Sequence, residues 1–426
     1  MGKNTRGEVI VVIHSANQSS GMKPADMKLN NRVQILELFK SGEPLSANAI
    51  AEGVGISRQT VMKAIQFFVE KGILASTGKA RSGVSGGKRA ELYSLSADQY
   101  LFHVLISPDD LYIALFNYRF EMVDTCAIGG LSMPGVDEIV SLAGNTCYKL
   151  LLKNDISRHS LRGLCITTSG IVDRSTGRLK FNSLYPNWGS DVPIAEKLSA
   201  FFDEGTVTLI ENVGKVCGSA YLHDQRLQGK RGLTLFSAWG GVCACLMSGG
   251  RILNGKDSLI GEIGHMMLEP SDPEICGCGS HGCFERQVSN DRIRRIIAEG
   301  RDAHPESPLS RIPADAAAVQ AVFDASAAGD PFARGIVEAL AGYFAVALKN
   351  ITLMFNPELV VFQGEYARAD DAFWRAVDAH LASFHYYNAA RPFRLETDCR
   401  AIPDVATLGA YTLLIDRLFS DEAVYS

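Results

Sequence analysis

The chain has 426 residues, of which 46% are hydrophobic and 21% are charged, and this balance is ordinary for a soluble globular protein with more than one domain. The net charge of −5 is uneven, because cations are in excess in residues 1–95 and anions in the remainder, so we expect only the first part to contact a polyanion. No apolar run reaches 18 residues and no signal-peptide core precedes the first domain, which excludes a transmembrane helix and predicts a cytoplasmic protein without a membrane partner.

A helix-turn-helix is predicted after a polar tail over residues 1–26. Two short helices, a turn that contains glycine and a third helix follow one another, which is the order of that motif. Serines that stand before the second and third helices are suitable N-caps. The predicted helices are Asn31–Lys40, Ala47–Glu52 after Ser46, and a third helix from Ser57 to about Lys71.

The third helix has one apolar face and one polar face. Val61, Ile65, Phe68 and Val69 repeat at helical spacing and predict the buried stripe. The polar face points away from this stripe, and its Gln and Lys side chains can bond adenine, guanine or phosphate. An ordinary solvated helix is the alternative. The residues expected to contact DNA from this helix are Ser57, Arg58, Gln59, Thr60, Lys63 and Gln66.

The next segment is typical of a wing. Ile73–Ala75 and Glu91–Leu95 have the pattern of two strands, and the loop between them is rich in glycine. A flexible basic loop can lie on the phosphate backbone or enter the minor groove, whereas a plain linker is the alternative. Its four cations are Lys79, Arg81, Lys88 and Arg89. The sequence therefore favours a winged helix-turn-helix over residues 27–96 that binds a double-stranded DNA operator.

From about Ala97 strands and helices alternate, which predicts an α/β domain. A long helix is predicted over Val136–Lys153, and a final helix is predicted to open near Leu408. The predicted strands are Tyr100–Ile106, Leu111–Asn117, Phe120–Ala127 and Leu161–Thr167.

Four metal-ligating residues lie close together in the sequence of the second half. They are His265, Cys276, Cys278 and Cys283, and three thiols with one imidazole form the closed tetrahedral set of structural zinc. His281 lies inside the loop and is a rival for the fourth position. We favour His265, because the intervening segment lets the loop close back on it.

Two glutamates flank this predicted zinc clip. Neither Glu262 nor Glu285 is needed by the metal, so a rigid clip would leave both carboxylates free to accept hydrogen bonds. Carboxylates fixed in this way suit a polyol such as a sugar. The remaining cysteines indicate a reducing compartment rather than a disulfide scaffold.

The stretch from Gly261 to Glu285 resembles the signature of the ROK family of repressors and sugar kinases, which is Gly-Glu-x-Gly-His followed by Cys-x-Cys-Gly-x-x-Gly-Cys-x-Glu. The resemblance continues from about Met27 to the C-terminus. It implies a two-lobed actin-like (ribonuclease H-like) fold around a cleft. The implied lobes are residues 97–214 with 405–426, and residues 215–404. It also implies a homodimer or a homotetramer.

The resemblance further implies a sugar-type ligand in the cleft. Through its second ring nitrogen, His265 would contact this ligand while also binding zinc. The residues that match the family's sugar ligands are Asn212, Glu262, His265 and Glu285, with Gly170 and Asn182 as looser matches.

The segments that kinases of this family need for phosphoryl transfer are altered here. The phosphate loop is replaced by Ser107-Pro108-Asp109-Asp110, which has no glycine and carries two carboxylates. The aspartate that serves as general base is replaced by Val213, and such a base is typically worth about 10²–10⁴ in rate. The Thr-Gly-x-Gly segment reads Ala238-Trp239-Gly240-Gly241, and the later glycine triplet reads Gln363-Gly364-Glu365.

These features favour a DNA-binding transcriptional regulator, most simply a repressor of carbohydrate genes, in which a catalytically inactive ROK domain senses a sugar or a sugar derivative. Val213 weakens the expected sugar site, because the aspartate that it replaces also bonds the sugar. The alternatives are a sugar kinase with an appended DNA-binding module, and a DNA-binding scaffold that needs no ligand.

Overall fold

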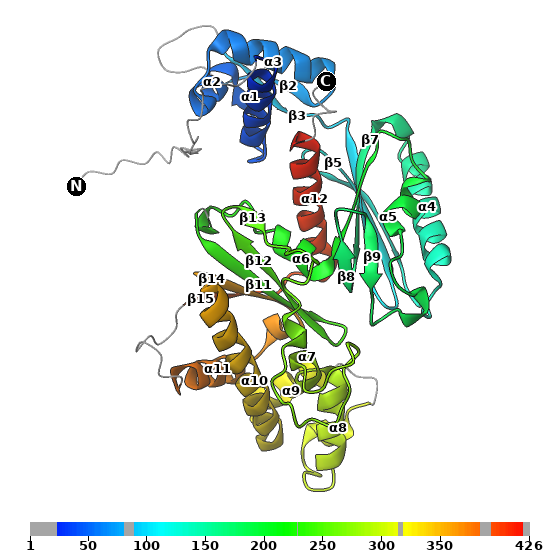
Figure 1. Cartoon of the computed structure of the whole chain (residues 1–426), viewed down its shortest axis with the longest axis vertical. Coiled ribbons are helices and arrows are strands. Elements are labelled where there is room, and N and C mark those ends of the chain that lie inside the picture. Colours follow the sequence, from blue (N-terminus) through cyan, green and yellow to red (C-terminus); the bar gives the residue numbers. More distant parts are fainter. Residues whose placement is uncertain (1–23, 81–88, 228, 314–317, 384–392, 421–426) are drawn as a thin grey trace, which may run out of the picture.

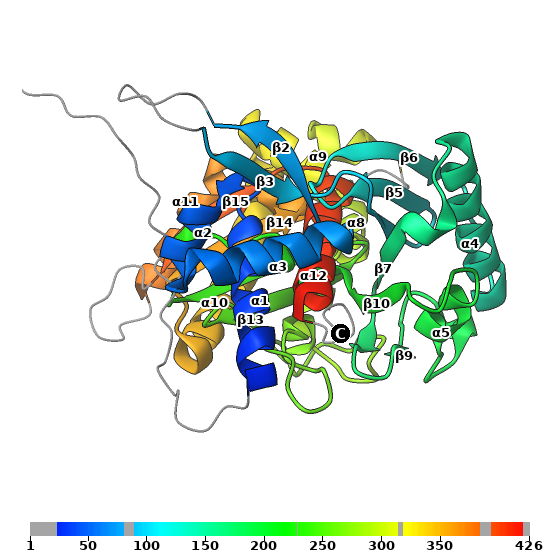
Figure 2. The ribbon, with the colours of Figure 1, turned by 90° about the horizontal axis from the view of Figure 1, so that it is seen from above.

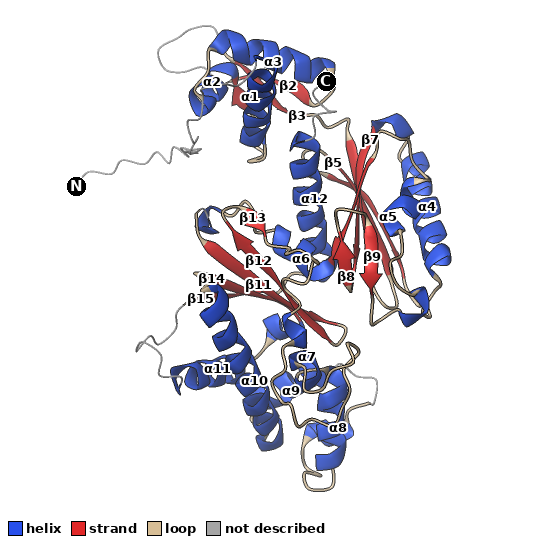
Figure 3. Cartoon of the chain, in the orientation of Figure 1, coloured by secondary structure: helices blue, strands red, loops and turns tan. Residues whose placement is uncertain are grey.

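The computed structural model describes residues 24–80, 89–227, 229–313, 318–383 and 393–420. It consists of an N-terminal winged helix-turn-helix domain above two lobes, each built on a five-stranded sheet (Figure 1). Figure 3 shows that helices flank both sheets. The predicted fold class, a winged helix-turn-helix followed by a two-lobed α/β body, is confirmed.

The N-terminal domain packs three helices against a small sheet of order β1-β3-β2. The side chains of Ser46 and Ser57 accept hydrogen bonds from the backbone N–H groups of Ala49 and Thr60, so both predicted N-caps are confirmed. The elements are α1 (Pro24–Phe39), β1 (Leu45–Ser46), α2 (Ala47–Val54), α3 (Arg58–Glu70), β2 (Leu74–Lys79) and β3 (Glu91–Leu95).

Two predictions for this domain need correction. Helix α1 begins at Pro24, so residues 24–26 belong to a helix rather than to the predicted tail. Val69 is 43% exposed and does not join the buried stripe of α3, in which Ala64 is buried instead. The buried stripe therefore keeps four residues but lies on the side of Ala64 rather than of Val69.

The sheet of the first lobe has the order β10-β7-β4-β5-β6. Helices α4 and α5 cover one face, and α12 packs on the other face (Figure 1). The bounds are β4 (Tyr100–Ile106), β5 (Leu111–Asn117), β6 (Met122–Ile128), α4 (Val136–Lys153), β7 (Leu161–Thr168), β8 (Ile171–Asp173), β9 (Arg178–Phe181), α5 (Ile194–Ser199), β10 (Val207–Asn212) and α6 (Val213–Ser219). Phe120 lies in the turn before β6, with a φ of 60°, and not in the predicted strand.

The sheet of the second lobe has the order β13-β12-β11-β14-β15. Helix α10 is long and apolar enough to cross a membrane, by length and composition only. Half of its apolar stretch is buried, however, and the helix packs in the core against α9 and α11. The bounds are β11 (Arg231–Ala238), β12 (Gly241–Ser248), β13 (Arg251–Ile252), α7 (Phe284–Gln287), α8 (Asn290–Gly300), α9 (Ala318–Ala327), α10 (Pro331–Phe355), β14 (Leu359–Gly364), α11 (Asp371–Ser383) and β15 (Arg394–Asp398).

Helix α12 (Ile402–Ser420) returns from the second lobe to the first. It begins six residues before Leu408, where the sequence predicted its start, because Pro403 is compatible with a first helical turn. At Gly409 it crosses α6 so closely that a Cβ would lie 1.7 Å from the carbonyl oxygen of Val216. The expected lobe boundary at residues 214–215 therefore falls inside α6, a helix that contacts both sheets.

Candidate functional site

One imidazole and three thiols gather in the second lobe, between the 3₁₀ turn Ile263–His265 and helix α7. The ligand atoms of His265, Cys276, Cys278 and Cys283 all lie within 4.8 Å of one another. His265 Nδ1 is 3.6 Å from the Cys276 sulfur, and the sulfurs of Cys278 and Cys283 are 3.6 Å apart. These four side chains can therefore hold one metal ion.

The loop that carries the thiols is shaped by its backbone. The N–H of Cys276 donates to the carbonyl oxygen of Ser280 at 2.8 Å. Gly282 has a φ of 65°, and a Cβ there would lie 1.9 Å from the carbonyl oxygen of Glu269, so no other residue fits. The rival ligand His281 faces away, because its Nδ1 lies 3.1 Å from the carbonyl oxygen of Asp272.

The three thiols of the cluster differ in pKa. Burial raises the pKa of Cys276 and, together with a hydrogen bond to Cys278, raises that of Cys283 to about 11. For Cys278, burial raises the pKa, but hydrogen bonds that begin with the backbone N–H of Ser280 outweigh it and lower the pKa to about 7. Thiolates are the metal-binding form, so metal binding must release protons here.

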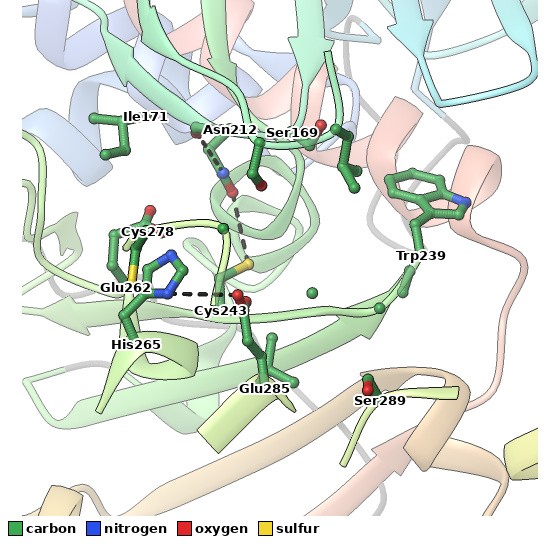
Figure 4. Close-up of a pocket in the computed structure, with 18 of the residues that line it drawn as sticks. Ser169, Ile171, Asn212, Trp239, Cys243, Glu262, His265, Cys278, Glu285 and Ser289 are labelled. Carbon is green, nitrogen blue, oxygen red and sulfur yellow. Dashed lines mark hydrogen bonds and ion pairs between the residues drawn. The ribbon is translucent and has the colours of Figure 1, made fainter. Parts of the chain in front are cut away.

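A cleft with a volume of about 720 Å³ lies beside this cluster, between the two lobes (Figure 4). Five of the six predicted ligand-binding residues line it, which are Gly170, Asn212, Glu262, His265 and Glu285. The sixth, Asn182, is not among the lining residues. It is buried behind the wall, where its side chain bonds the backbone and the hydroxyl of Ser169, so it positions the wall instead.

The polar side of the cleft is made by carboxylates and the imidazole. Oε1 of Glu285 is 3.4 Å from His265 Nδ1 and 3.1 Å from the Cys276 sulfur, which places this carboxylate between the cluster and the cavity. Burial raises the pKa of Glu262, and the nearby His265 and Lys215 partly offset this. The arrangement can accept hydrogen bonds from vicinal hydroxyl groups.

Asn212 and Val213 stand where β10 passes into α6. The Asn212 side chain caps α6, since its Oδ1 accepts from the N–H of Gly214 at 2.8 Å, while its Nδ2 donates to the carbonyl oxygen of Gly170 at 2.8 Å. Val213 lines the same cavity with a side chain that is 3% exposed and cannot take a proton. Position 213 therefore offers no general base.

Trp239 is a lining residue that the sequence marked only as a departure from the kinase pattern. It sits in the turn between β11 and β12 with a φ of 53°, which is strained for a bulky side chain and costs of the order of 1–3 kcal/mol. The carboxylate of Glu365 accepts from the backbone N–H of Trp239 and is itself held by Asn290 at 3.1 Å. The sequence did contain a signal for this ring, because the run Trp239-Gly240-Gly241 between two apolar strands is typical of a hairpin turn.

Trp239 also lines a second cavity, with a volume of about 680 Å³. The turn between β4 and β5 borders it, and this turn is closed on itself, because the hydroxyl of Ser107 donates to the carbonyl oxygen of Asp110 at 3.0 Å. The hydroxyl of Tyr185 donates to the carbonyl oxygen of Ser107. Asp110 and Glu365 line the cavity together with Arg368 and Arg400, so its wall carries charges of both signs.

The side chains predicted to contact DNA lie on the outer surface of the N-terminal domain. Helix α3 faces away from the lobes (Figure 2). Ser57, Arg58, Gln59, Thr60, Lys63 and Gln66 are all exposed. Gln66 Nε2 donates to Glu70 at 3.0 Å, so it is less available than Gln59 or Lys63. Lys79 and Arg89 are exposed at the two ends of the wing, while Arg81 and Lys88 lie outside the described residues.

Comparison with known proteins agrees with this arrangement. A glucokinase of Halalkalibacterium halodurans is 26% identical over 291 residues, which are 68% of this chain and 87% of that protein. The DNA-binding transcriptional dual regulator NagC of Escherichia coli is 24% identical over 375 residues, which are 83% of this chain and 84% of that protein. The crystal structure of a ROK family transcriptional regulator, a homologue of the E. coli MLC protein, has a TM-score of 0.78 at 18% identity and covers 94% of this chain and 100% of its own.

Sequence models of two families match the chain in the places where the structure shows the corresponding domains. The model of winged helix-turn-helix DNA-binding domains matches residues 29–75. The model of the ROK family matches residues 111–417, which is more than half of the chain and includes most of both lobes, the cysteine cluster and the cleft. The chain therefore belongs to the ROK family and carries a winged helix-turn-helix at its N-terminus.

Proposed function

We propose that this protein is a DNA-binding transcriptional regulator, a repressor of carbohydrate genes, that senses a sugar-type ligand in the cleft between its lobes. One observation carries the proposal. The same chain joins a winged helix-turn-helix with an exposed polar recognition helix to a cleft that has paired carboxylates but has Val213 where a kinase would need a base. NagC is a transcriptional regulator, and the similarity to it covers 84% of its length, which supports the same function.

In this proposal the cysteine cluster holds one structural zinc ion. Three thiols and one imidazole fill a tetrahedral site, so no position remains for a reacting water. The ion's part is to fix the loop between His265 and Cys283, which sets the positions of Glu262 and Glu285 at the cleft.

The protein does not transfer phosphate in this proposal. Val213 cannot accept the proton of a sugar hydroxyl, and the turn Ser107–Asp110 is closed by the hydrogen bond from the Ser107 hydroxyl to the carbonyl oxygen of Asp110. The similarity to glucokinases over 291 residues makes a sugar kinase the second candidate. A scaffold that needs no ligand is the third, and it is disfavoured because a cleft of about 720 Å³ is preserved.

In this proposal the regulator acts in the cytoplasm. It is a homo-oligomer, because a helix-turn-helix protein usually reads two half-sites about one helical turn apart. A ligand shifts DNA affinity only if it binds two arrangements of the lobes unequally.

The test combines two measurements on the full chain. Labelled promoter fragments of carbohydrate genes are titrated with protein, with and without each sugar of a panel, and ADP release is followed in parallel with ATP and the same sugars. We expect one fragment to bind at least about tenfold tighter than random DNA, one sugar to change that affinity, and no ADP release. Equal binding to every fragment, or sustained ADP release, would overturn the proposal.

A further inference from the structure

The cleft between the lobes is chemically divided. In Figure 4, His265, Glu262 and Glu285 lie on one side, and Trp239 lies on the other. A simple sugar has one apolar patch, the C–H groups on a face of its ring, and a single aromatic side chain can cover it, so a pocket made for the sugar alone needs only one such contact. Here, seven of the lining residues have branched or aromatic apolar side chains, which are Ile171, Phe181, Leu184, Val213, Phe236, Trp239 and Val242.

Four of these apolar side chains remain at least partly accessible, and two of the four, Phe181 and Trp239, are aromatic. Phe181, at the end of β9, is 41% exposed and comes from the first lobe. Trp239 comes from the second lobe and is half-buried, with its ring 6.2 Å from that of Phe236. Large apolar groups left accessible inside a cleft indicate a ligand that covers them.

The conformation of Trp239 points to the same conclusion. A bulky residue at a φ of 53° is unfavourable, and Gly240 follows it directly, so a tight turn would form more easily with a small residue at this position. The carboxylate of Glu365 nevertheless holds the backbone of Trp239 in place. Strain that surrounding contacts maintain in this way is found at ligand clamps.

We infer that the ligand is a carbohydrate with a flat apolar substituent, of which an aryl glycoside is the simplest form. The sugar ring lies against Glu262, His265 and Glu285, and the substituent lies on the ring of Trp239. Stacking on an aromatic face suits a flat group, because the indole offers a large planar surface. This inference rests on the proposed function, since it names the class of ligand for the same cleft.

The experiment compares matched methyl and phenyl glycosides of glucose, galactose, xylose and N-acetylglucosamine by isothermal titration calorimetry on the full chain. In at least one sugar series we expect the phenyl glycoside to bind about tenfold tighter or more than the methyl glycoside. Trp239→Gly removes the ring and suits the positive φ, and it should reduce this ratio to within about twofold. Trp239→Phe should keep most of the ratio, and Trp374→Phe, which lies outside the cleft, should leave it unchanged.

The outcomes separate this inference from the proposed function. If methyl glycosides bind but phenyl glycosides bind no tighter, or if Trp239→Gly keeps the ratio, the apolar substituent is wrong and the sugar sensor stands. If no glycoside of either kind binds while a promoter fragment is still recognised, both the substituent and the sugar sensor fall.

Discussion

The ammonium group of Lys40, the residue that follows helix α1, lies 2.7 Å from the carboxylate of Asp416, and this ion pair joins the DNA-binding domain to helix α12 of the first lobe. His223 Nε2 contacts the same carboxylate at 2.9 Å. Burial raises the pKa of Asp416, but its hydrogen bonds to His223 and Lys40 and their charges outweigh this and lower it. The contact therefore fixes the DNA-binding domain on the body that holds the cleft.

Removing the carboxylate of Asp416 should weaken the contact between the DNA-binding domain and the first lobe. We expect Asp416→Asn to lower the free energy of unfolding by about 1.5–3 kcal/mol, because hydrogen bonds to a charged group are lost at a partly buried site. Urea denaturation followed by circular dichroism measures it. The control is Asp137→Asn, which breaks an exposed pair with Lys197 and should change stability by less than about 1 kcal/mol. Equal effects of the two variants would contradict the role of Asp416.

The cysteine cluster should bind one zinc ion per chain. We expect plasma emission spectrometry of the purified protein to find about one equivalent, and Cys276→Ser to lose it and to lower the melting temperature, because a closed site contributes to folding. Cys399→Ser is the matched control, since Cys399 is an exposed thiol outside the cluster. Retention of zinc by Cys276→Ser would show that the cluster is not the site.

Stability should increase with pH in the acid range because of His103. This side chain is buried between Thr407 and Thr167, at 2.9 and 3.0 Å, and burial lowers its pKa to about 3. An unfolded histidine binds a proton below about pH 6.5, so between about pH 3 and 6.5 the unfolded state holds more protons and folding is penalised. The contribution is therefore complete above about pH 6.5 and is lost as the pH falls.

The measurement is urea unfolding at several pH values between 4.5 and 6.5, compared with His103→Gln, which keeps a polar group and does not titrate. The free energy of unfolding of the native protein should rise by about 1.4 kcal/mol per pH unit more than that of the variant. If the free energies of unfolding of the native protein and of the variant change with pH in parallel, His103 is not the cause of the pH dependence.

Specific DNA recognition should depend on the exposed face of α3. We expect Gln59→Ala to weaken operator binding by about 1–3 kcal/mol and to relax the base preference at one position, since a bidentate contact to adenine is lost. Lys63→Ala should reduce the affinity for operator and random DNA together if the lysine contacts phosphate. Lys28→Ala on α1 removes an exposed cation and serves as the control in the same gel-shift titration. A Gln59→Ala variant with unchanged specificity would rule out this residue as a base contact.

Restoring the missing base should not restore a kinase. We expect Val213→Asp to release no ADP from ATP with any hexose or amino sugar, because the closed turn Ser107–Asp110 still disfavours a nucleotide. The assay is coupled ADP detection, with an active glucokinase as the positive control. Turnover by this variant would mean that Val213 alone separates the protein from an enzyme.

Local patterns in the sequence predicted much of the fold. The helix Val136–Lys153 and the strands Tyr100–Ile106 and Leu111–Asn117 have the bounds that apolar periodicity indicated. The cysteine spacing likewise predicted which four side chains come together, because all of them lie within one short segment.

The rest of the site depends on contacts between distant segments. Phe181 and Trp239 line the same cleft from different lobes, and no local pattern relates them. Asn182 matched a family position in sequence, but its side chain is turned to Ser169 and not to the cavity. Such orientations are set by tertiary packing.

The close crossing of α6 and α12 at Gly409 has a thermodynamic consequence. Helix α6 starts at the floor of the cleft, and α12 carries Asp416 to the DNA-binding domain, with no side chain at Gly409 to separate their backbones. Under the proposed function, a ligand that moves one helix also displaces the other, and we expect occupancy of the cleft and occupancy of the operator to be coupled. Because such coupling is reciprocal, operator DNA must change the affinity of the ligand by the same factor by which the ligand changes the affinity for DNA.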